Sequence, residues 1–365
     1  MNKILLLTLH SQNNNFGSVL QAHSLYSFME EMGNDITILN YQPYYSNGAV
    51  SFKAFIKKAV TNFMFLPAYL LRTKRFNRLV NAKKLTRKAT RFSELIEISK
   101  EYDSFLIGSD QVWNPHYLCG RDDAYFLKFT DSKNKASYAA SIGTEDITDA
   151  EWNDIADKLS DFRYVSLREN KSCLQLKKHG IKDAHYVLDP VFLHNADYYR
   201  RLESKAIEDK GYILAYIIHK DPFVLQVVDK ISQITGKQVI QIGGFLSKCN
   251  YDKFYRSAGP AEFLYLIDNA DFIVTSSFHG TAFADIFNKQ FAVVMPSGNT
   301  LRLENILETA GTENRVIKSL SDVEKMLEPI DYVHVNEKIN AKLEDSIDYI
   351  KELIENIGVS QSADM

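Results

Sequence analysis

The chain is poor in cysteine, and its three cysteines lie far apart. Cys119, Cys173 and Cys249 form no CxxC pair. A scattered, odd-numbered set argues against a disulfide framework and against a zinc site, so we expect no bound metal. It also favours a reducing compartment, and we expect the protein in the cytoplasm.

Long apolar runs are absent as well. The run at residues 4–9 is too short for the apolar part of a secretory signal, and no small-residue cleavage site follows it. No window of the sequence reaches the length of a transmembrane helix. The sequence therefore predicts neither a signal peptide nor a membrane-spanning segment.

Net charge argues against a nucleic-acid-binding protein, and motif content argues against a dinucleotide-binding one. A formal net charge of −3 indicates no general affinity for nucleic acid. The polar loop after the first apolar run is not GxGxxG, so we expect no dinucleotide. With 45% apolar and 24% charged residues, the composition is that of a soluble globular protein, and 365 residues predict two domains.

The stretch around which the chain is organised is residues 271–289. An apolar run at 272–274 is followed by Ser276 and Ser277, and from 278 onward the apolar residues have helical spacing. This pattern predicts a buried strand, a tight turn and a helix that begins near His279. We expect Ser276 or Ser277 to cap the helix, and Gly280 to let a ligand approach the backbone closely.

Such a strand–turn–helix unit suits an anionic ligand. The helix start leaves unpaired N–H groups and the positive end of the helix dipole at the carboxyl edge of a sheet, where phosphate or carboxylate binds well. His279 lies in the first turn. The alternative is an ordinary turn with an incidental histidine. The crowding of hydroxyls, glycine and imidazole favours a functional site.

Strands alternate with helices along the whole chain. We predict strands at 4–9, 35–41, 102–108, 135–143, 164–168 and 187–191, and then at 212–218, 238–242, 272–274 and 291–295. The pattern predicts an α/β fold with two doubly wound, Rossmann-like domains that face each other across a cleft, as in B-type glycosyltransferases. We expect domains at 1–195 and 205–330, and a C-terminal helix at 336–357 that folds back.

Polar and aromatic residues follow the strand predicted at 102–108. A carboxylate, an amide and an indole at Asp110, Gln111 and Trp113 suit a sugar, because aromatic faces stack on sugar rings and polar groups bind hydroxyls. The alternative is an Asx-turn capped by Asp110, with Trp113 in the core. Farther along, Arg168 is either an anion clamp or the partner of Glu169 in a surface ion pair.

Residues 51–93 form a basic insertion in the first domain. They contain twelve basic residues and no acidic one, and they enclose an apolar segment at 61–71. This composition is typical of a segment that binds a membrane surface or an anionic polymer. The alternative is a pair of solvated basic helices that pack Phe63, Phe65 and Leu66 into the core.

Six short blocks carry a resemblance to a known family. They are NFGSVLQA at 15–22, IGSDQVWN at 107–114, YAASIG at 138–143, SLREN at 166–170, DPVFL at 189–193 and SSFHG at 276–280. In these blocks the chain resembles the polysaccharide pyruvyl transferases. The resemblance covers most of the chain.

The resemblance implies a B-type glycosyltransferase-like fold and a reaction. The pyruvyl group of phosphoenolpyruvate would be transferred to two hydroxyls of one sugar, as a cyclic ketal on a bacterial surface polysaccharide or its lipid-linked precursor. Phosphoenolpyruvate is the donor substrate, so no cofactor is expected. A lipid-linked acceptor also implies peripheral contact with the inner face of the membrane. We expect the first domain on the acceptor side and the second on the donor side.

The resemblance also suggests roles for residues. It associates Arg168 and His279 with the phosphoenolpyruvate site. We expect His279 to act as acid or phosphate contact, Arg168 as anion clamp and Asp110 as base on the acceptor. The expected substrate-binding residues are Gly17, Ser18, Gln21, Ser109, Gln111, Trp113, Ser141, Ser276, Ser277, Gly280 and Arg302.

One position departs from the family pattern. A family member often has arginine two positions before the histidine, where this chain has Ser277. An anion-clamping charge is then missing, unless Arg302 or another basic residue supplies it. Two other classes stay open: a glycosyltransferase that uses a nucleotide sugar, and a non-catalytic sugar-binding relative.

Overall fold

The structure is a computed structural model that describes residues 2–10, 14–44, 65–218, 221–243, 251–298 and 300–357. The chain divides into two compact units. Unit 1 comprises Met1–Ser51, Leu79–Leu193 and Lys342–Met365, and unit 2 comprises Phe52–Arg78 and His194–Ala341. The division differs from the expected one in the basic stretch, because residues 52–78 group with unit 2.

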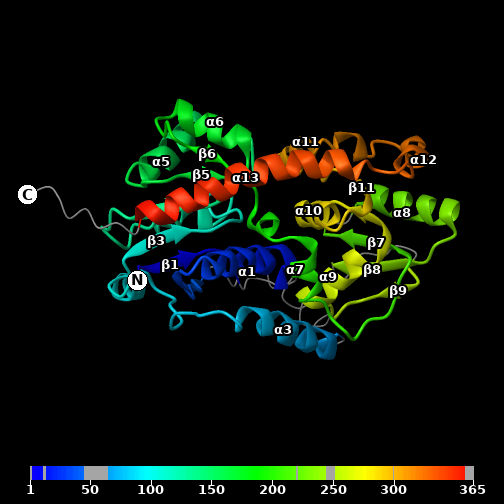
Figure 1. The fold of residues 1–365 in the computed structure, drawn as a ribbon, viewed down its shortest axis with the longest axis horizontal. Helices are drawn as coiled ribbons and strands as arrows, with labels where there is room; N and C mark the ends of the chain where they lie inside the picture. The colour runs from blue at the N-terminus through cyan, green and yellow to red at the C-terminus, as the bar shows by residue number, and fades with distance from the viewer. Residues whose placement is uncertain are drawn as a thin grey trace, which may run out of the picture. The chain divides into compact units, whose positions relative to one another are not determined.

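Unit 1 is built on a four-stranded parallel sheet with the order β2-β1-β3-β4. Its two central strands, β1 and β3, are labelled in Figure 1. Its strands are β1 (Lys3–Leu7), β2 (Asp35–Ile38), β3 (Ser104–Ile107) and β4 (Lys135–Ser137), and a parallel pair, β5 (Ser166–Leu167) and β6 (His185–Tyr186), continues it through single bridges. The helices are α1 (Phe16–Glu31), α4 (Phe92–Ser99), α5 (Asp149–Leu159) and α6 (Asn170–Lys178), with short 3-10 turns η3 (Cys119–Arg121), η4 (Asp123–Phe126) and η5 (Pro190–Leu193).

Unit 2 is built on a five-stranded parallel sheet with the order β11-β10-β7-β8-β9. Its strands are β7 (Tyr212–Ile217), β8 (Val239–Gly243), β9 (Lys253–Phe254), β10 (Ala270–Thr275) and β11 (Gln290–Val293). The helices are α7 (Ala196–Arg200), α8 (Pro222–Thr235), α9 (Pro260–Asp268), α10 (Phe278–Ile286), α11 (Leu301–Ala310) and α12 (Val323–Met326), with turns η6 (Glu313–Arg315) and η7 (Leu320–Asp322).

Two helices run across the division of the chain. Helix α3 (Leu66–Val80) belongs to unit 2 up to Arg78, and α13 (Tyr332–Ile357) belongs to unit 2 up to Ala341 and to unit 1 beyond it. Among the helices within the described ranges, none is long and apolar enough to cross a membrane.

The central strands are buried on both faces, which explains their continuous apolar sequences. In β1 the residues Ile4–Leu7 are at most 1% exposed, and all six residues of β7 are buried. Parallel strands covered by helices on both sides have this pattern. Both units have Rossmann-like α/β architecture, as the alternating sequence pattern predicts.

One of the predicted strands is wrong. We expected a strand at 187–191, but β6 ends at Tyr186, before this range, and η5 begins at Pro190. Proline has no N–H to donate to a strand ladder. Instead, the N–H of Val191 bonds the Asp189 side chain at 3.1 Å. The chain therefore turns at Asp189 and leaves this carboxylate at the end of β6.

A carboxyl pair in unit 2 makes the stability of the fold depend on pH. Burial, followed by the negative charge of Asp268, raises the pKa of Glu203 to about 7. Asp268 is already paired with Arg200 at 2.8 Å and lies 3.7 Å from Lys289. The folded protein therefore binds a proton at Glu203 more tightly than the unfolded chain does.

We predict that the free energy of unfolding decreases as the pH rises from about 4.5 to above 7, because the raised pKa favours the fold only while Glu203 is protonated. The variant Glu203→Gln should lose this dependence and be more stable than the parent at pH 8. The control is Glu208→Gln at an exposed glutamate. Urea unfolding at pH 5 and pH 8 measures the free energy of unfolding of the parent and of both variants. An equal change of this free energy with pH in Glu203→Gln and in the parent would contradict the prediction.

Candidate functional site

The carboxyl edge of the unit 1 sheet gathers the polar residues that follow its strands. Thr8 follows β1, and Ser109 and Asp110 follow β3. Thr8 Oγ1 donates to the carbonyl of Ser109 at 2.9 Å, which ties the two strand ends together. Ligands of open α/β sheets bind at this edge.

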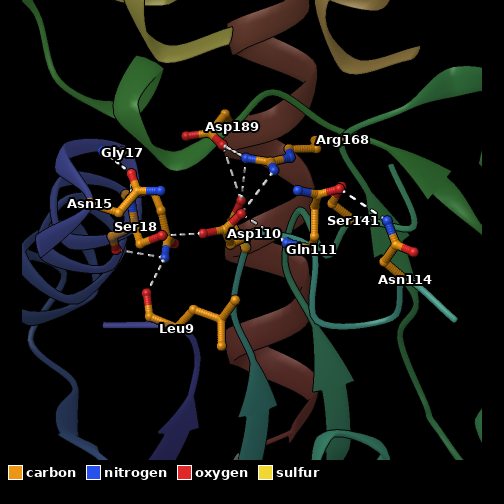
Figure 2. Close-up of polar contacts among 12 residues, drawn as sticks. Leu9, Asn15, Gly17, Ser18, Asp110, Gln111, Asn114, Ser141, Arg168 and Asp189 are labelled. Carbon is orange, nitrogen blue, oxygen red and sulfur yellow. Dashed lines mark hydrogen bonds and ion pairs between the residues drawn. The ribbon is translucent and has the colours of Figure 1, made fainter. Parts of the chain in front are cut away.

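Arg168 lies at the centre of this edge, in contact with three carboxylates. Its Nη1 is 2.5 Å from Asp189 Oδ2, its Nη2 is 3.3 Å from Asp110 Oδ1, and its Nε is 3.7 Å from Glu169 Oε1. Figure 2 shows Asp110 and Asp189 pointing toward the guanidinium. The Arg168 side chain is 1% exposed. The pair with Glu169 is therefore buried, not the surface pair considered from the sequence.

Electrostatics keeps this arginine charged. Burial lowers the pKa of Arg168, but the charges of Asp189, Asp110 and Glu169 more than offset burial, and the pKa is raised. One guanidinium faces three carboxylates, which is a net formal charge of −2 when all four groups are ionised. The cluster therefore repels anions and suits neutral groups that donate hydrogen bonds, such as hydroxyls.

Asp110 is held in an unusual backbone conformation. Its φ is +78°, a region that residues other than glycine rarely adopt. Its Oδ1 accepts from the N–H of Gln111 at 2.9 Å, as an Asx-turn does, and its Oδ2 accepts from Ser18 Oγ at 2.5 Å. With Arg168, these contacts orient the Asp110 carboxylate at the carboxyl end of β3 (Figure 2).

The start of α1 reaches the same edge. Asn15 caps the helix, because its side chain accepts from the N–H groups of Gly17 and Ser18. Gln21 is fully buried, and its amide donates to Thr8 Oγ1, to the carbonyl of Leu9 and to the carbonyl of Ser18. Gln21 thus fixes α1 to the end of β1 and leaves Ser18 to contact Asp110.

Trp113 is a core residue, which was the alternative to sugar stacking. It is 0% exposed, its Nε1 donates to the carbonyl of Tyr125 at 2.8 Å, and its ring stacks on Phe126. Gln111 accepts from Asn114 at 3.0 Å, and Ser141 donates to Glu169. These three residues therefore support the edge, and Trp113 has no exposed face for a sugar ring.

The carboxyl edge of the unit 2 sheet carries the stretch that organises the sequence. Strand β10 ends at Thr275 and α10 begins at Phe278. Ser277 is the N-cap, with its side chain accepting from the Gly280 N–H at 3.4 Å, so the prediction of a serine cap is confirmed. The first turn of α10 contains no acidic residue.

Gly280 is required by close packing at this helix start. A Cβ at this position would lie 2.8 Å from Cδ1 of Tyr216 and would also overlap the side chain of Thr275. Thr275 Oγ1 donates to the carbonyl of Tyr216 at 3.0 Å and accepts from the Ser277 N–H at 3.1 Å. Burial raises the pKa of Tyr216 to about 12, and a hydrogen bond with Ser277 and the charge of Arg72 oppose that rise.

The remaining expected residues of unit 2 lie on α10 and α11. His279 is 6% exposed, in the first turn of α10, with its ring edge-on to Phe278 at 5.0 Å. Ser276 is 7% exposed, and within the described part of the chain its Oγ has no hydrogen-bond partner. Arg302 lies half-buried in the first turn of α11, which packs against α10.

Sequence reasoning missed several partners of these residues. Asp189 was placed inside the strand predicted at 187–191, and Tyr216 and Arg72 were not assigned to the site at all. The signal for Asp189 was its place before Pro190, where a chain turn leaves a carboxylate at a sheet edge. Across the described ranges, no group of three or more His, Cys, Asp and Glu side chains is arranged to hold a metal ion.

Comparison with known proteins adds the family and the fold. The family model described as "Polysaccharide pyruvyl transferase" matches residues 15–298. No curated protein matches the chain at a significant level. Among solved structures, UDP-GlcNAc 2-epimerase from Methanocaldococcus jannaschii is 14% identical with a TM-score of 0.55, and the match covers 90% of this chain and 92% of that one.

Two further structures were solved with nucleotides. UDP-GlcNAc 2-epimerase from Neisseria meningitidis, bound to UDP-GlcNAc, is 10% identical with a TM-score of 0.56, covering 97% of this chain and 100% of that chain. Anabaena Alr3699/HepE, in complex with UDP, is 9% identical with a TM-score of 0.55, covering 97% and 99%. At these identities the likeness shows the fold alone. It confirms the predicted B-type glycosyltransferase-like class.

We predict that Arg168→Met lowers the free energy of unfolding by about 3–5 kcal/mol, because it leaves three carboxylates buried without their cation. Adding Asp189→Asn should recover part of the loss by removing one of these charges. The control is Arg163→Met, at an exposed arginine of the same unit. Urea unfolding measures all three, and a loss no larger than that of the control would contradict the prediction.

Proposed function

Because the chain belongs to the polysaccharide pyruvyl transferase family, we propose that it transfers the pyruvyl group of phosphoenolpyruvate to two hydroxyls of one sugar. The product is a cyclic ketal on a polysaccharide or its lipid-linked precursor. The proposal assigns the donor to the start of α10 in unit 2. It assigns the acceptor to the carboxyl edge of the unit 1 sheet.

The observation that carries this assignment is the opposite electrostatic character of the two edges. The start of α10 offers backbone N–H groups, the positive helix end and His279, with no acid in its first turn. The unit 1 edge has one guanidinium for three carboxylates. A donor with a phosphate and a carboxylate is favoured at the first edge and repelled at the second, while a sugar hydroxyl is accepted by the second.

The reaction needs one acid and one base, and its atoms balance without a further reactant. A proton adds to the methylene carbon of phosphoenolpyruvate, and the first sugar hydroxyl bonds to C2. The bond from C2 to the phosphate oxygen then breaks, and the second hydroxyl closes the ketal. Of the two hydroxyl protons released, one replaces the proton given to the methylene carbon and one leaves with phosphate. In our proposal His279 is the acid or phosphate contact, and Asp110 the base.

Arg168 has a different role in this proposal from the anion clamp expected from the sequence. A clamp presents its guanidinium to the ligand, whereas here all three of its nitrogens face carboxylates. We assign it to holding Asp110 in its strained conformation. Ser18, which donates to the same carboxylate, completes the support.

A nucleotide-sugar transferase is the second candidate, because the Neisseria and Anabaena structures that share the fold contain UDP-GlcNAc and UDP. One assay separates the two. Phosphate release from phosphoenolpyruvate is measured with lipid-linked galactosides, glucosides and N-acetylmannosaminides as acceptors. Phosphate release that depends on an acceptor supports the pyruvyl transferase. Release of UDP from a nucleotide sugar, with none of phosphate, would replace it with the second candidate.

We predict that His279→Asn lowers turnover by roughly a hundredfold or more, since it removes the acid or the phosphate contact while keeping a buried polar group. Thermal unfolding should change little. The control is His334→Gln, at an exposed histidine of α13. Steady-state kinetics on both variants tests this, and near-parental turnover of His279→Asn would remove the residue from the mechanism.

We also propose that α3 brings the protein to an anionic membrane surface, where a lipid-linked acceptor would lie. The first turns of α3 expose Leu66, Tyr69, Leu70 and Leu71 by 38–57%. The next turns expose Lys74 and Arg78. An outward face that is apolar at one end and basic at the other suits shallow insertion beside anionic headgroups. The basic and apolar residues at 53–64 lie outside the described residues.

We predict that the protein sediments with anionic vesicles at low salt, not with neutral ones, and that salt releases it. Each basic residue near the surface contributes about 1 kcal/mol, and the attraction is screened within about 10 Å at 0.1 M salt. Lys74→Glu with Arg78→Glu should abolish sedimentation. The control reverses the same number of charges on the exposed Lys177 and Lys178 of α6. If both double variants bind alike, α3 has no special part in binding.

A further inference from the structure

The start of α10 has no guanidinium or ammonium group of its own. The turn at 275–281 contains no lysine or arginine. A phosphate group carries up to two negative charges, and a helix end alone is equivalent to about half a positive charge. The structure points to a cation from a distant segment of unit 2.

We propose that Arg72 of α3 supplies the positive charge that binds the phosphate group of the donor at the start of α10. This inference rests on the donor site proposed for unit 2 and adds a residue to it. Arg72 lies more than two hundred positions before His279 in the sequence. It belongs to the basic stretch at 51–93, in which we assign the exposed Lys74 and Arg78 to membrane binding instead.

The packing of α3 fixes where Arg72 points. Arg75, one turn later, pairs with Glu262 at 3.2 Å and donates to the carbonyl of Ser257 at 2.8 Å. A Cβ on Gly259 would overlap the Cβ of Arg75, so α3 lies directly against the chain that starts α9. Arg72 and Phe76, on the same side of the helix as Arg75, are buried, with Arg72 only 7% exposed. Arg72 is therefore directed into unit 2, away from the exposed face.

Tyr216 connects Arg72 to the helix start. Its ring packs against Gly280 in the first turn of α10, and its main-chain carbonyl accepts from Thr275 at the end of β10. The Tyr216 ring also lies edge-on to Phe263 of α9 at 5.1 Å, and α3 packs against the start of that same helix through Arg75 and Gly259. In agreement with this packing, burial lowers the pKa of Arg72 and the charge of Tyr216 opposes that effect. A buried cation such as Arg72 is attracted to an anion more strongly than an exposed cation is, because little water screens the attraction.

A second feature of the same turn indicates a ligand. The Oγ of Ser276, 93% buried, has no hydrogen-bond partner in the described ranges. A buried hydroxyl without a partner is costly and is usually satisfied by a ligand or water. Ser276 directly precedes the N-cap Ser277, so a phosphate at the helix start would be within its reach.

The test is the affinity of the whole protein for three probes: phosphoenolpyruvate, inorganic phosphate and UDP. Isothermal titration calorimetry is done on the parent, Arg72→Gln and the control Arg87→Gln. The control makes the same charge change at an exposed arginine of the basic stretch. We expect Arg72→Gln to weaken every probe that the parent binds by about tenfold to a hundredfold, as the loss of a charged hydrogen-bond donor does. Arg87→Gln should bind as the parent does.

The outcomes separate this inference from the proposed function. One outcome is that the parent binds UDP or phosphate but not phosphoenolpyruvate, with that binding weakened in Arg72→Gln. In that case phosphoenolpyruvate is not the donor, and the proposed role of Arg72 stands. Parental affinity in a folded Arg72→Gln overturns the role of Arg72, whatever the activity. A parent that binds none of the probes overturns both.

If Arg72→Gln does not fold, a second variant tests the proposal. Arg72→Lys keeps the buried charge but cannot copy the planar fork of the guanidinium. It should weaken the same probes several-fold, with thermal unfolding close to that of the parent. Unchanged affinity in Arg72→Lys, when Arg72→Gln does not fold, also overturns the proposal.

Discussion

The contact of Arg168 with Asp110, Asp189 and Glu169 is the interaction on which the unit 1 edge depends. The four side chains follow three separate strands, and a buried carboxylate is stable only when a cation or hydrogen-bond donors face it. The positions of these strand ends are therefore fixed partly by charge. Asp110 has a backbone conformation that costs of order 1–3 kcal/mol, which Arg168, Ser18 and the Asx-turn offset.

This cluster also decides what the edge can bind. Adding an anion to a site with three carboxyl groups for one guanidinium is opposed by Coulomb repulsion when those carboxyl groups are ionised, and the repulsion is strong where water is excluded. Removing a proton from a bound hydroxyl is helped by a neighbouring carboxylate. In our proposal, the residues that look like an anion site in the sequence, an arginine among polar groups, therefore form the acceptor site.

The sequence predicted what short-range patterns encode. The strand, serine cap and helix at 271–289 follow one another in the chain, so the change of period and the cap residue were enough to place them. The partners of Arg168 were not predictable in this way, because Asp110 lies 58 positions away and Asp189 lies 21 away. Trp113 shows a second limit. A local pattern cannot tell whether an aromatic ring after a strand faces a ligand or the core.

The basic stretch shows a third limit, because composition does not say which face of a helix a charge occupies. In α3, Arg72 and Arg75 are turned into unit 2, whereas Lys74 and Arg78 are exposed. Four similar charges in one helix therefore have different surroundings in the fold. Only the contacts of α3 with Glu262, Ser257 and Gly259 separate them.

The serine at position 277 is consistent with a cation that comes from elsewhere. An N-cap must accept a hydrogen bond from the helix backbone, and Ser277 does so from Gly280. Serine is among the best residues for this, with a contribution of about 1 kcal/mol, whereas an arginine side chain has no acceptor. A loop that uses this position as a cap must obtain positive charge from another segment. Because Coulomb attraction depends on distance and not on chain order, a buried arginine from another segment, as we propose for Arg72, can meet the same requirement.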